Sequence, residues 1–120
     1  MQYMLLIYGT EDGWEAMSEE ERGRIFQAYG AFTKELQDAG AMVAGDALES
    51  TQTATTVRVK NDETLTTDGP FAETKEQLGG YYLVEADSLD EAIEWAAKIP
   101  AARHGSVEVR PVMVFEEDGS

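Results

Sequence analysis

Two short segments of the chain are apolar on both faces of an extended strand, and this feature constrains the fold more than any other. They are residues 2–8 and residues 81–84. Alternate side chains of a strand point to opposite sides, so a strand that is apolar on both sides needs cover on both. We therefore expect both segments to be central strands of one sheet. In the first segment the two sides are Tyr3, Leu5 and Ile7, and Met4, Leu6 and Tyr8.

Two capping boxes predict the two helices. Residues 18–21 and residues 88–91 have the Ser-x-x-Glu spacing, in which the serine side chain accepts a hydrogen bond from the third residue of the helix. Gly40 ends the first helix after about residue 39, and Pro100 ends the second. The predicted apolar stripes are Ile25, Tyr29, Phe32 and Leu36 on the first helix, and Leu89, Ala92, Ile93 and Ala96 on the second.

The rest of the chain supplies shorter elements. They are predicted as strands at residues 41–48 and 106–115, a β-hairpin of residues 55–60 and 63–67, and an acidic loop at residues 9–17 that carries Trp14. Asn61 and Asp62 lie at the hairpin turn, where the backbone adopts positive φ angles that these two residue types tolerate. The hairpin is therefore an insert between two β-α-β halves.

This order of elements predicts an α+β domain of the ferredoxin-like type, with a four-stranded antiparallel sheet and both helices on one face. We assign one domain to residues 1–115 and expect the acidic residues 116–120 to fray. The uncovered face would expose Met4, Leu6 and Tyr8, an apolar patch that rarely stays open on a monomer. Either the sheets of two copies pack together in a homodimer, or the hairpin folds over this face within one chain. We favour the homodimer because the apolar surface is wide.

Composition excludes several kinds of site and partner. The 120 residues include 24 Asp and Glu, 9 Lys and Arg, one His and no Cys, which gives a net charge of −15. Without cysteine there is no disulfide, thiolate zinc site or cysteine nucleophile. The negative charge repels a nucleic-acid backbone, and the spacing of an EF-hand is absent. We predict no metal, no cofactor and no direct nucleic-acid contact.

The first apolar segment also bears on location. Residues 2–8 are too short to span a bilayer and have no basic residues before them. We therefore expect no membrane association and a cytoplasmic location.

A longer run of sequence resembles a known family. Residues 67–82 read Thr-Asp-Gly-Pro-Phe-Ala-Glu-Thr-Lys-Glu-Gln-Leu-Gly-Gly-Tyr-Tyr, which is similar to the DGPF branch of the YCII-related family. Residues 3–8, 54–58 and 107–111 fit in order, so the resemblance covers nearly the whole chain. It implies a dimeric α/β barrel, and a sigma-factor-like protein of the extracytoplasmic-function type as partner, because branch members are often encoded beside such proteins or fused to them.

The resemblance implies less about chemistry. Some YCII-like proteins are suspected enzymes with a His–Asp pair in a cleft between sheet and helix. The only histidine here is His104, and none lies in or near the first helix. That pair is therefore not carried over to this sequence.

The turn formed by Asp68, Gly69, Pro70 and Phe71 has two interpretations. As a site, Asp68 is a polar contact and Phe71 is one wall of a pocket. As a structural turn, Gly69 takes an unusual φ angle, Pro70 fixes the exit and Phe71 fills the core. We favour the structural interpretation, although a rigid turn often frames a site as well.

Other candidate residues have similar alternatives. Glu73 and Lys75 orient a ligand, or they join an exposed ion-pair cluster. Arg110 clamps a carboxylate, or it pairs with Glu108 beside it. Tyr8 lines a pocket, or it belongs to the core with the other aromatic residues.

Acid–base candidates are few. A histidine titrates near neutral pH, but no orienting partner can be named for His104, so His104 and Asp68 are only weak catalytic candidates and the catalytic residues stay unknown.

Two hypotheses about function remain open. The first is a small dimeric protein of unassigned reaction that binds a small molecule in a cleft near residues 68–75. Its ligand-binding residues would be Asp68, Gly69, Phe71, Glu73, Lys75, Arg110 and Tyr8. The second is a non-enzymatic dimeric module that binds a sigma-factor-like protein, with a basic partner surface favoured by the acidity of the chain.

Overall fold

The computed structural model describes residues 1–115 and shows an α+β chain. The elements are β1 (Gln2–Gly9), α1 (Glu11–Ala16), α2 (Glu19–Asp38), β2 (Met42–Ala47), β3 (Thr55–Lys60), β4 (Glu63–Asp68), β5 (Gln77–Glu85), α3 (Leu89–Lys98) and β6 (Ser106–Pro111), with 3-10 turns η1 (Thr51–Thr53) and η2 (Pro100–Arg103). The acidic tail predicted at residues 116–120 lies outside the described residues. No helix among residues 1–115 is long and apolar enough to cross a membrane.

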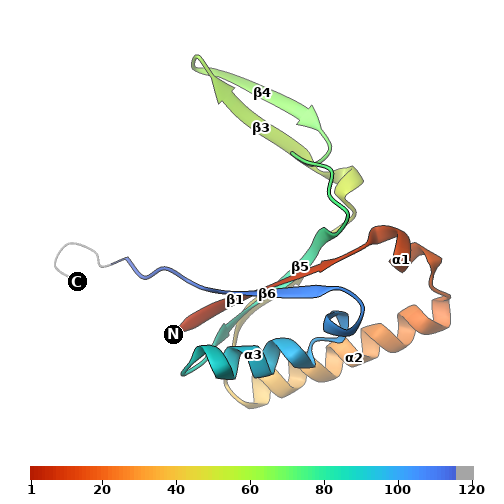
Figure 1. Ribbon diagram of the computed structural model, residues 1–120, viewed down its shortest axis with the longest axis vertical. Helices are drawn as coiled ribbons and strands as arrows, with labels where there is room; N and C mark the ends of the chain where they lie inside the picture. The colour runs from red at the N-terminus through yellow and green to blue at the C-terminus, as the bar shows by residue number, and fades with distance from the viewer. Residues whose placement is uncertain (116–120) are drawn as a thin grey trace.

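The main sheet has four antiparallel strands in the order β2-β5-β1-β6 (Figure 1). The two segments with two apolar faces, β1 and β5, are the central strands, as predicted. Leu5 lies opposite Tyr82 on one side and Val109 on the other. Helices α2 and α3 cover the face that carries these side chains (Figure 1).

The core lies between these helices and the sheet. Leu5, Leu36, Val84 and Ile99 are fully buried. The ring of Phe32 meets the ring of Tyr82 edge-on, with centroids 5.1 Å apart. Burying each such large side chain contributes about 1.5–3 kcal/mol, so this layer holds helices and sheet together.

The predicted stripe of α3 is only half right. Ala92 and Ala96 are buried, but Leu89 and Ile93 are half exposed. The two alanines form the face that packs on the sheet, because small side chains allow a close approach of the helix. The space beside them is filled by Trp95, whose ring lies 6.3 Å from that of Phe32.

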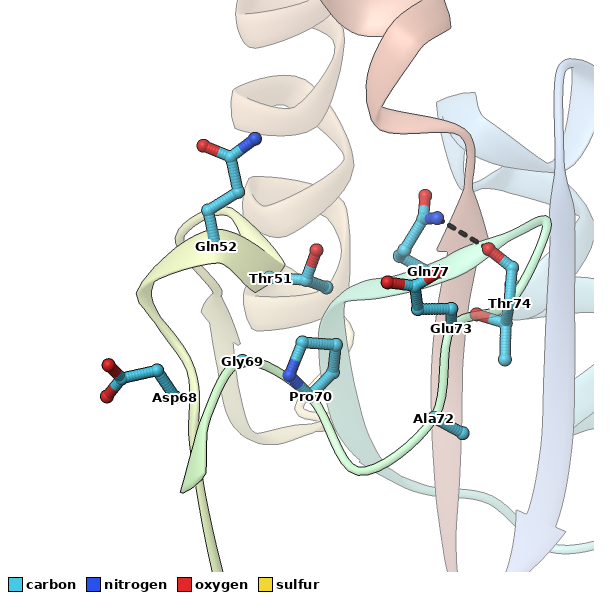
Figure 2. Close-up of a pocket in the computed structure, with 9 residues that line it drawn as sticks. All are labelled: Thr51, Gln52, Asp68, Gly69, Pro70, Ala72, Glu73, Thr74 and Gln77. Carbon is cyan, nitrogen blue, oxygen red and sulfur yellow. Dashed lines mark hydrogen bonds between the residues drawn. The ribbon is translucent and has the colours of Figure 1, made fainter. Parts of the chain in front are cut away.

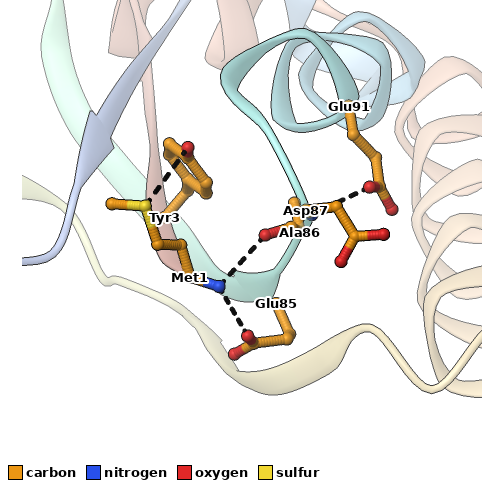
Figure 3. Close-up of polar contacts among 6 residues, drawn as sticks. All are labelled: Met1, Tyr3, Glu85, Ala86, Asp87 and Glu91. Carbon is orange, nitrogen blue, oxygen red and sulfur yellow. Dashed lines mark hydrogen bonds and ion pairs between the residues drawn. The ribbon is translucent and has the colours of Figure 1, made fainter.

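Both capping boxes form. The Oγ atoms of Ser18 and Ser88 accept hydrogen bonds from the backbone N–H groups of Glu21 and Glu91, each at 3.1 Å. The Glu91 carboxylate in turn accepts from the N–H of Asp87 at 2.9 Å (Figure 3). These contacts satisfy N–H groups that a helix leaves free at its start, so the helix starts follow from local sequence.

The N-terminus is tied to the far end of β5. The ammonium group of Met1 donates to the Glu85 carboxylate at 2.7 Å and to the Ala86 carbonyl at 3.1 Å (Figure 3). This holds the first residue of the chain at the point where β5 leaves the sheet.

Three predicted boundaries are wrong. Residues 9–17 are not all loop, because the Thr10 side chain accepts from the Gly13 N–H and starts the short helix α1. The last strand ends at Pro111 rather than residue 115. The Val112 N–H donates to the carbonyl of Gln2, which is the first residue of β1, so β1 has no further backbone group with which β6 could pair. β5 also starts at Gln77, four residues earlier than expected.

The hairpin of β3 and β4 is a separate two-stranded sheet, with Asn61 and Asp62 at φ angles of 52° and 63° in its turn, as predicted. It projects away from the main sheet (Figure 1). Within residues 1–115, the hairpin therefore does not fold over the uncovered face of the sheet. We call that uncovered face the open face. Its apolar residues are Met4, Leu6, Tyr8, Ala44, Leu78, Tyr81 and Leu83.

Candidate functional site

A cavity of about 460 Å³ lies at the root of the hairpin, where η1 and the loop before β5 meet (Figure 2). It is lined by Thr51, Gln52, Asp68, Gly69, Pro70, Ala72, Glu73, Thr74 and Gln77. Residues 68–74 connect the hairpin to the main sheet, so this cavity sits at the junction of the two sheets.

The turn at Gly69 is fixed by backbone contacts. Gly69 has a φ angle of 96°, a conformation that favours glycine. Its N–H donates to the Ala54 carbonyl at 2.7 Å, and its carbonyl accepts from the Thr56 hydroxyl at 2.8 Å. The turn is therefore a structural turn that also forms one wall of the cavity.

Glu11 fastens the opposite wall. Its carboxylate accepts from the backbone N–H of Thr51 at 2.6 Å, from the Thr51 hydroxyl at 3.1 Å and from the Ser50 hydroxyl at 3.2 Å. The backbone N–H of Thr51, and to a lesser extent the two hydroxyls, lowers the pKa of Glu11 below its ordinary value of 4.5, against a small opposing effect of burial. An ionised Glu11 thus holds η1 in place.

Gln77 joins the two walls. Its side-chain oxygen accepts from the Glu11 N–H at 3.1 Å, and its side-chain N–H donates to the Thr74 carbonyl at 2.7 Å (Figure 2). The first residue of β5 therefore positions both the Glu11 segment and the loop that carries Glu73.

Only some of the candidate residues within 68–75 line the cavity. Asp68, Gly69 and Glu73 line the cavity, whereas Phe71 and Lys75 are not among its lining residues. Figure 2 shows the Glu73 carboxylate toward the middle of the labelled residues and the Asp68 carboxylate pointing outward. Phe71 is 79% exposed, so it does not fill the core, and it is not among the residues that line this cavity.

Arg110 and Tyr8 lie elsewhere, on the open face. The Arg110 guanidinium donates to the Glu108 carboxylate at 2.7 Å, and this partner raises the pKa of Arg110 above its ordinary value. The ion-pair alternative is therefore the one observed. The sequence analysis grouped these residues with the turn at Gly69, but β1 and β6 carry them to a different surface.

The two acid–base candidates are also apart. His104 lies beside a groove of about 250 Å³ with Glu21, Arg24 and Ile25, whereas Asp68 lines the larger cavity. Within residues 1–115, no three histidine or acidic side chains are grouped so that they could hold a metal ion.

Sequence reasoning missed five residues of the cavity wall and the glutamate that holds it in place: Thr51, Gln52, Ala72, Thr74, Gln77 and Glu11. The Ser-Thr-Gln-Thr run at residues 50–53 was the available signal, because such polar clusters between strands mark ordered turns. Its contact with Glu11 spans 40 residues, and no local pattern predicts that.

Comparison with other proteins identifies the family of this chain. The YCII-related domain matches residues 1–116. The chain belongs to the YCII-related domain family. An uncharacterized protein of Rhizobium meliloti (strain 1021) is 40% identical over 118 residues, which cover 97% of this chain and 95% of that protein. The similarity between this YCII-related protein and that relative thus extends over nearly the full length of both.

The Glu11 contact predicts a pH dependence. The folded pKa is lowered, so the stabilisation of η1 is fully present above the ordinary value of 4.5 and is lost as the pH falls through the folded pKa. In an NMR titration, the Thr51 amide signal should move with Glu11 protonation below pH 4.5. Glu11→Gln should abolish that movement, and Glu15→Gln on the exposed side of α1 should preserve it. An unchanged Thr51 titration in Glu11→Gln would show that another group holds η1.

Proposed function

We propose that this YCII-related protein belongs to the DGPF branch and binds a small polar molecule in the cavity at the hairpin root. One observation carries the proposal: the block that resembles the branch, residues 67–82, supplies most of the cavity wall, including Asp68, Gly69 and Glu73. We further propose that residues 1–115 form a single domain and that the protein, which has no cysteine, is located in the cytoplasm.

The lining residues indicate the class of ligand. Glu73 directs its carboxylate toward the middle of the lining residues (Figure 2), and Thr51, Thr74, Gln52 and Gln77 supply hydroxyl and amide groups. Among residues 1–115, no basic side chain lines the cavity. A neutral polyhydroxy compound or a small amine fits these groups, whereas an anion would meet a carboxylate without a compensating cation.

The proposal concerns binding and leaves the reaction unassigned. His104 and Asp68 lie in separate depressions, and a general acid or base must reach the reacting atom within hydrogen-bond distance. The geometry therefore gives no acid–base pair on which a reaction could be argued.

A thermal-shift screen tests the ligand site. We expect polyamines, amino sugars or polyols to raise the melting temperature and dicarboxylates to leave it unchanged; a ligand at 100 times its Kd stabilises by about 2.7 kcal/mol. For an amine that binds, Glu73→Gln should weaken the affinity about tenfold, the loss of one charged contact, and Glu94→Gln on α3 should leave it unaltered. A panel with no active compound, or equal binding by both variants, would contradict the site.

The open face supports a homodimer. The strand order and the two helices on one side fit the ferredoxin-like arrangement, and Met4, Leu6 and Leu83 form the apolar middle of the side that the helices leave uncovered. We propose that two copies pack these faces together as a dimeric α/β barrel, since burial of apolar surface drives such association.

A charge placed in the middle of the open face tests the dimer. Leu6→Lys should raise the dissociation constant at least about 100-fold, because pairing would bury an uncompensated ammonium group. Gln27→Lys on the exposed side of α2 adds the same charge and should have no such effect. Sedimentation at micromolar concentration measures both, with circular dichroism to verify folding. A wild-type monomer, or a Leu6→Lys variant as dimeric as the wild type, would refute this pairing.

A second candidate function rests on the surface of α1 and α2. Phe26 is 65% exposed and meets Trp14 edge-on at 5.5 Å. The starts of the two helices are rich in acidic residues, at positions 11, 12, 15 and 19–21, while the Arg22 guanidinium lies 6.0 Å from the centre of the Trp14 ring. We propose this acidic aromatic corner as the docking surface for a basic segment of a sigma-factor-like protein, because complementary charge favours such a partner.

Pull-down with a sigma-factor-like protein encoded beside the gene tests this partner. Phe26→Ala should abolish capture, because exposed aromatic anchors carry most of the energy of such interfaces. Ile93→Ala, a similarly exposed apolar residue on α3, should leave it intact. No complex with the wild type at low salt, or loss with both variants alike, would count against the corner.

A further inference from the structure

The β3–β4 hairpin has one face that a soluble chain would not leave bare. The pairing places Val57 opposite Thr66 and Val59 opposite Thr64 on one face, which we call the valine face. Arg58, Lys60, Glu63 and the 42%-exposed Leu65 lie on the other face. Val57 is 58% and Val59 is 68% exposed. This alternation is typical of a strand with one covered and one solvated side.

The hairpin also lacks support from its own chain. A two-stranded hairpin is marginally stable in water unless other structure packs on it. The radius of gyration is 16.9 Å, against about 13–14 Å for a compact domain of this length. The excess reflects the projecting hairpin (Figure 1), so whatever covers the valine face comes from outside the described chain.

The areas favour a second copy as the cover. The apolar residues of the open face are partly buried by their neighbours, and together they expose on the order of 300 Å². Val57, Val59 and Phe71, which are 58%, 68% and 79% exposed, add roughly 400 Å². Together the two sets offer roughly 700 Å² of apolar surface on each copy, which is close to the roughly 800 Å² that a standard stable dimer buries on each partner.

We propose that the β3–β4 hairpin is an arm that packs its valine face, together with Phe71 from the loop that follows β4, on a second copy of the chain. This inference rests on the proposed homodimer and adds a contact that sheet pairing does not supply. In a two-fold dimer each copy gives one arm and receives one. The solvated face of the arm then carries Arg58 and Lys60.

Paired variants on adjacent positions of β3 test the arm. Val57→Gln with Val59→Gln should raise the dimer dissociation constant at least tenfold in sedimentation experiments. Arg58→Gln with Lys60→Gln, on the opposite face, should change it less than twofold at about 0.3 M salt, where charge effects are screened. The same dimer dissociation constant in the wild type and both double variants would refute the proposed arm contact but would not contradict the sheet pairing. A monomeric wild type would overturn both.

A fluorescence experiment decides the matter even if the valine variants misfold. The chain has no cysteine, so Val59→Cys and Lys60→Cys each provide a single labelling position for a polarity-sensitive dye. With rising protein concentration, the dye at position 59 should shift to the blue with the midpoint of dimerisation, and the dye at position 60 should not. No shift at position 59, or the same shift at both positions, would overturn the proposal, as would a shift that needs added lipid vesicles or another protein.

Discussion

The pairing of β1 with β5 is the constraint on which the rest of the structure depends. Leu5 and Val84 are fully buried on one side of these strands, which requires α2 and α3 to cover that side. Leu6 and Tyr81 lie opposite each other on the other side, where the described chain provides no cover. The same pairing thus builds the core and creates the open face, because strands with two apolar faces cannot be satisfied by one layer of helices.

Local sequence predicted the elements well because their signals are short-range. The Ser18 and Ser88 caps, the positive φ angle of Gly40 and the Asn61–Asp62 turn all involve residues within a few positions of one another. The prediction failed where packing decides. The apolar pattern of α3 favoured Leu89 and Ile93 as core residues, but the helix turns its alanines inward, and the stop of β6 at Pro111 depends on where β1 begins.

The candidate site was predictable only in its contiguous part. Asp68, Gly69 and Glu73 come from one specific run and line one cavity. The Glu11–Thr51 contact joins two segments 40 residues apart, and neither segment carries a motif that names the other. Arg110 was assigned to the same cleft from strand alternation and Tyr8 as an aromatic residue, but neither lines the cavity. Phe71 is 79% exposed rather than buried in the core, and the proposed dimer arm gives it a role that the sequence alone did not indicate.

The net charge of −15 opposes the association of two copies, but the positions of the charges reduce this repulsion. The acids gather at the starts of α1, α2 and α3, where helix dipoles favour them. On the open face Arg110 pairs with Glu108, and Asp46 accepts a hydrogen bond from the Tyr81 hydroxyl. Of these three charged groups, only Asp46 is left without an opposite charge, so the open face of each copy carries about one excess negative charge. Acids farther away are screened beyond about 8 Å at physiological salt. The proposed dimer can therefore bury its apolar middle while the acidic helix starts remain in solvent.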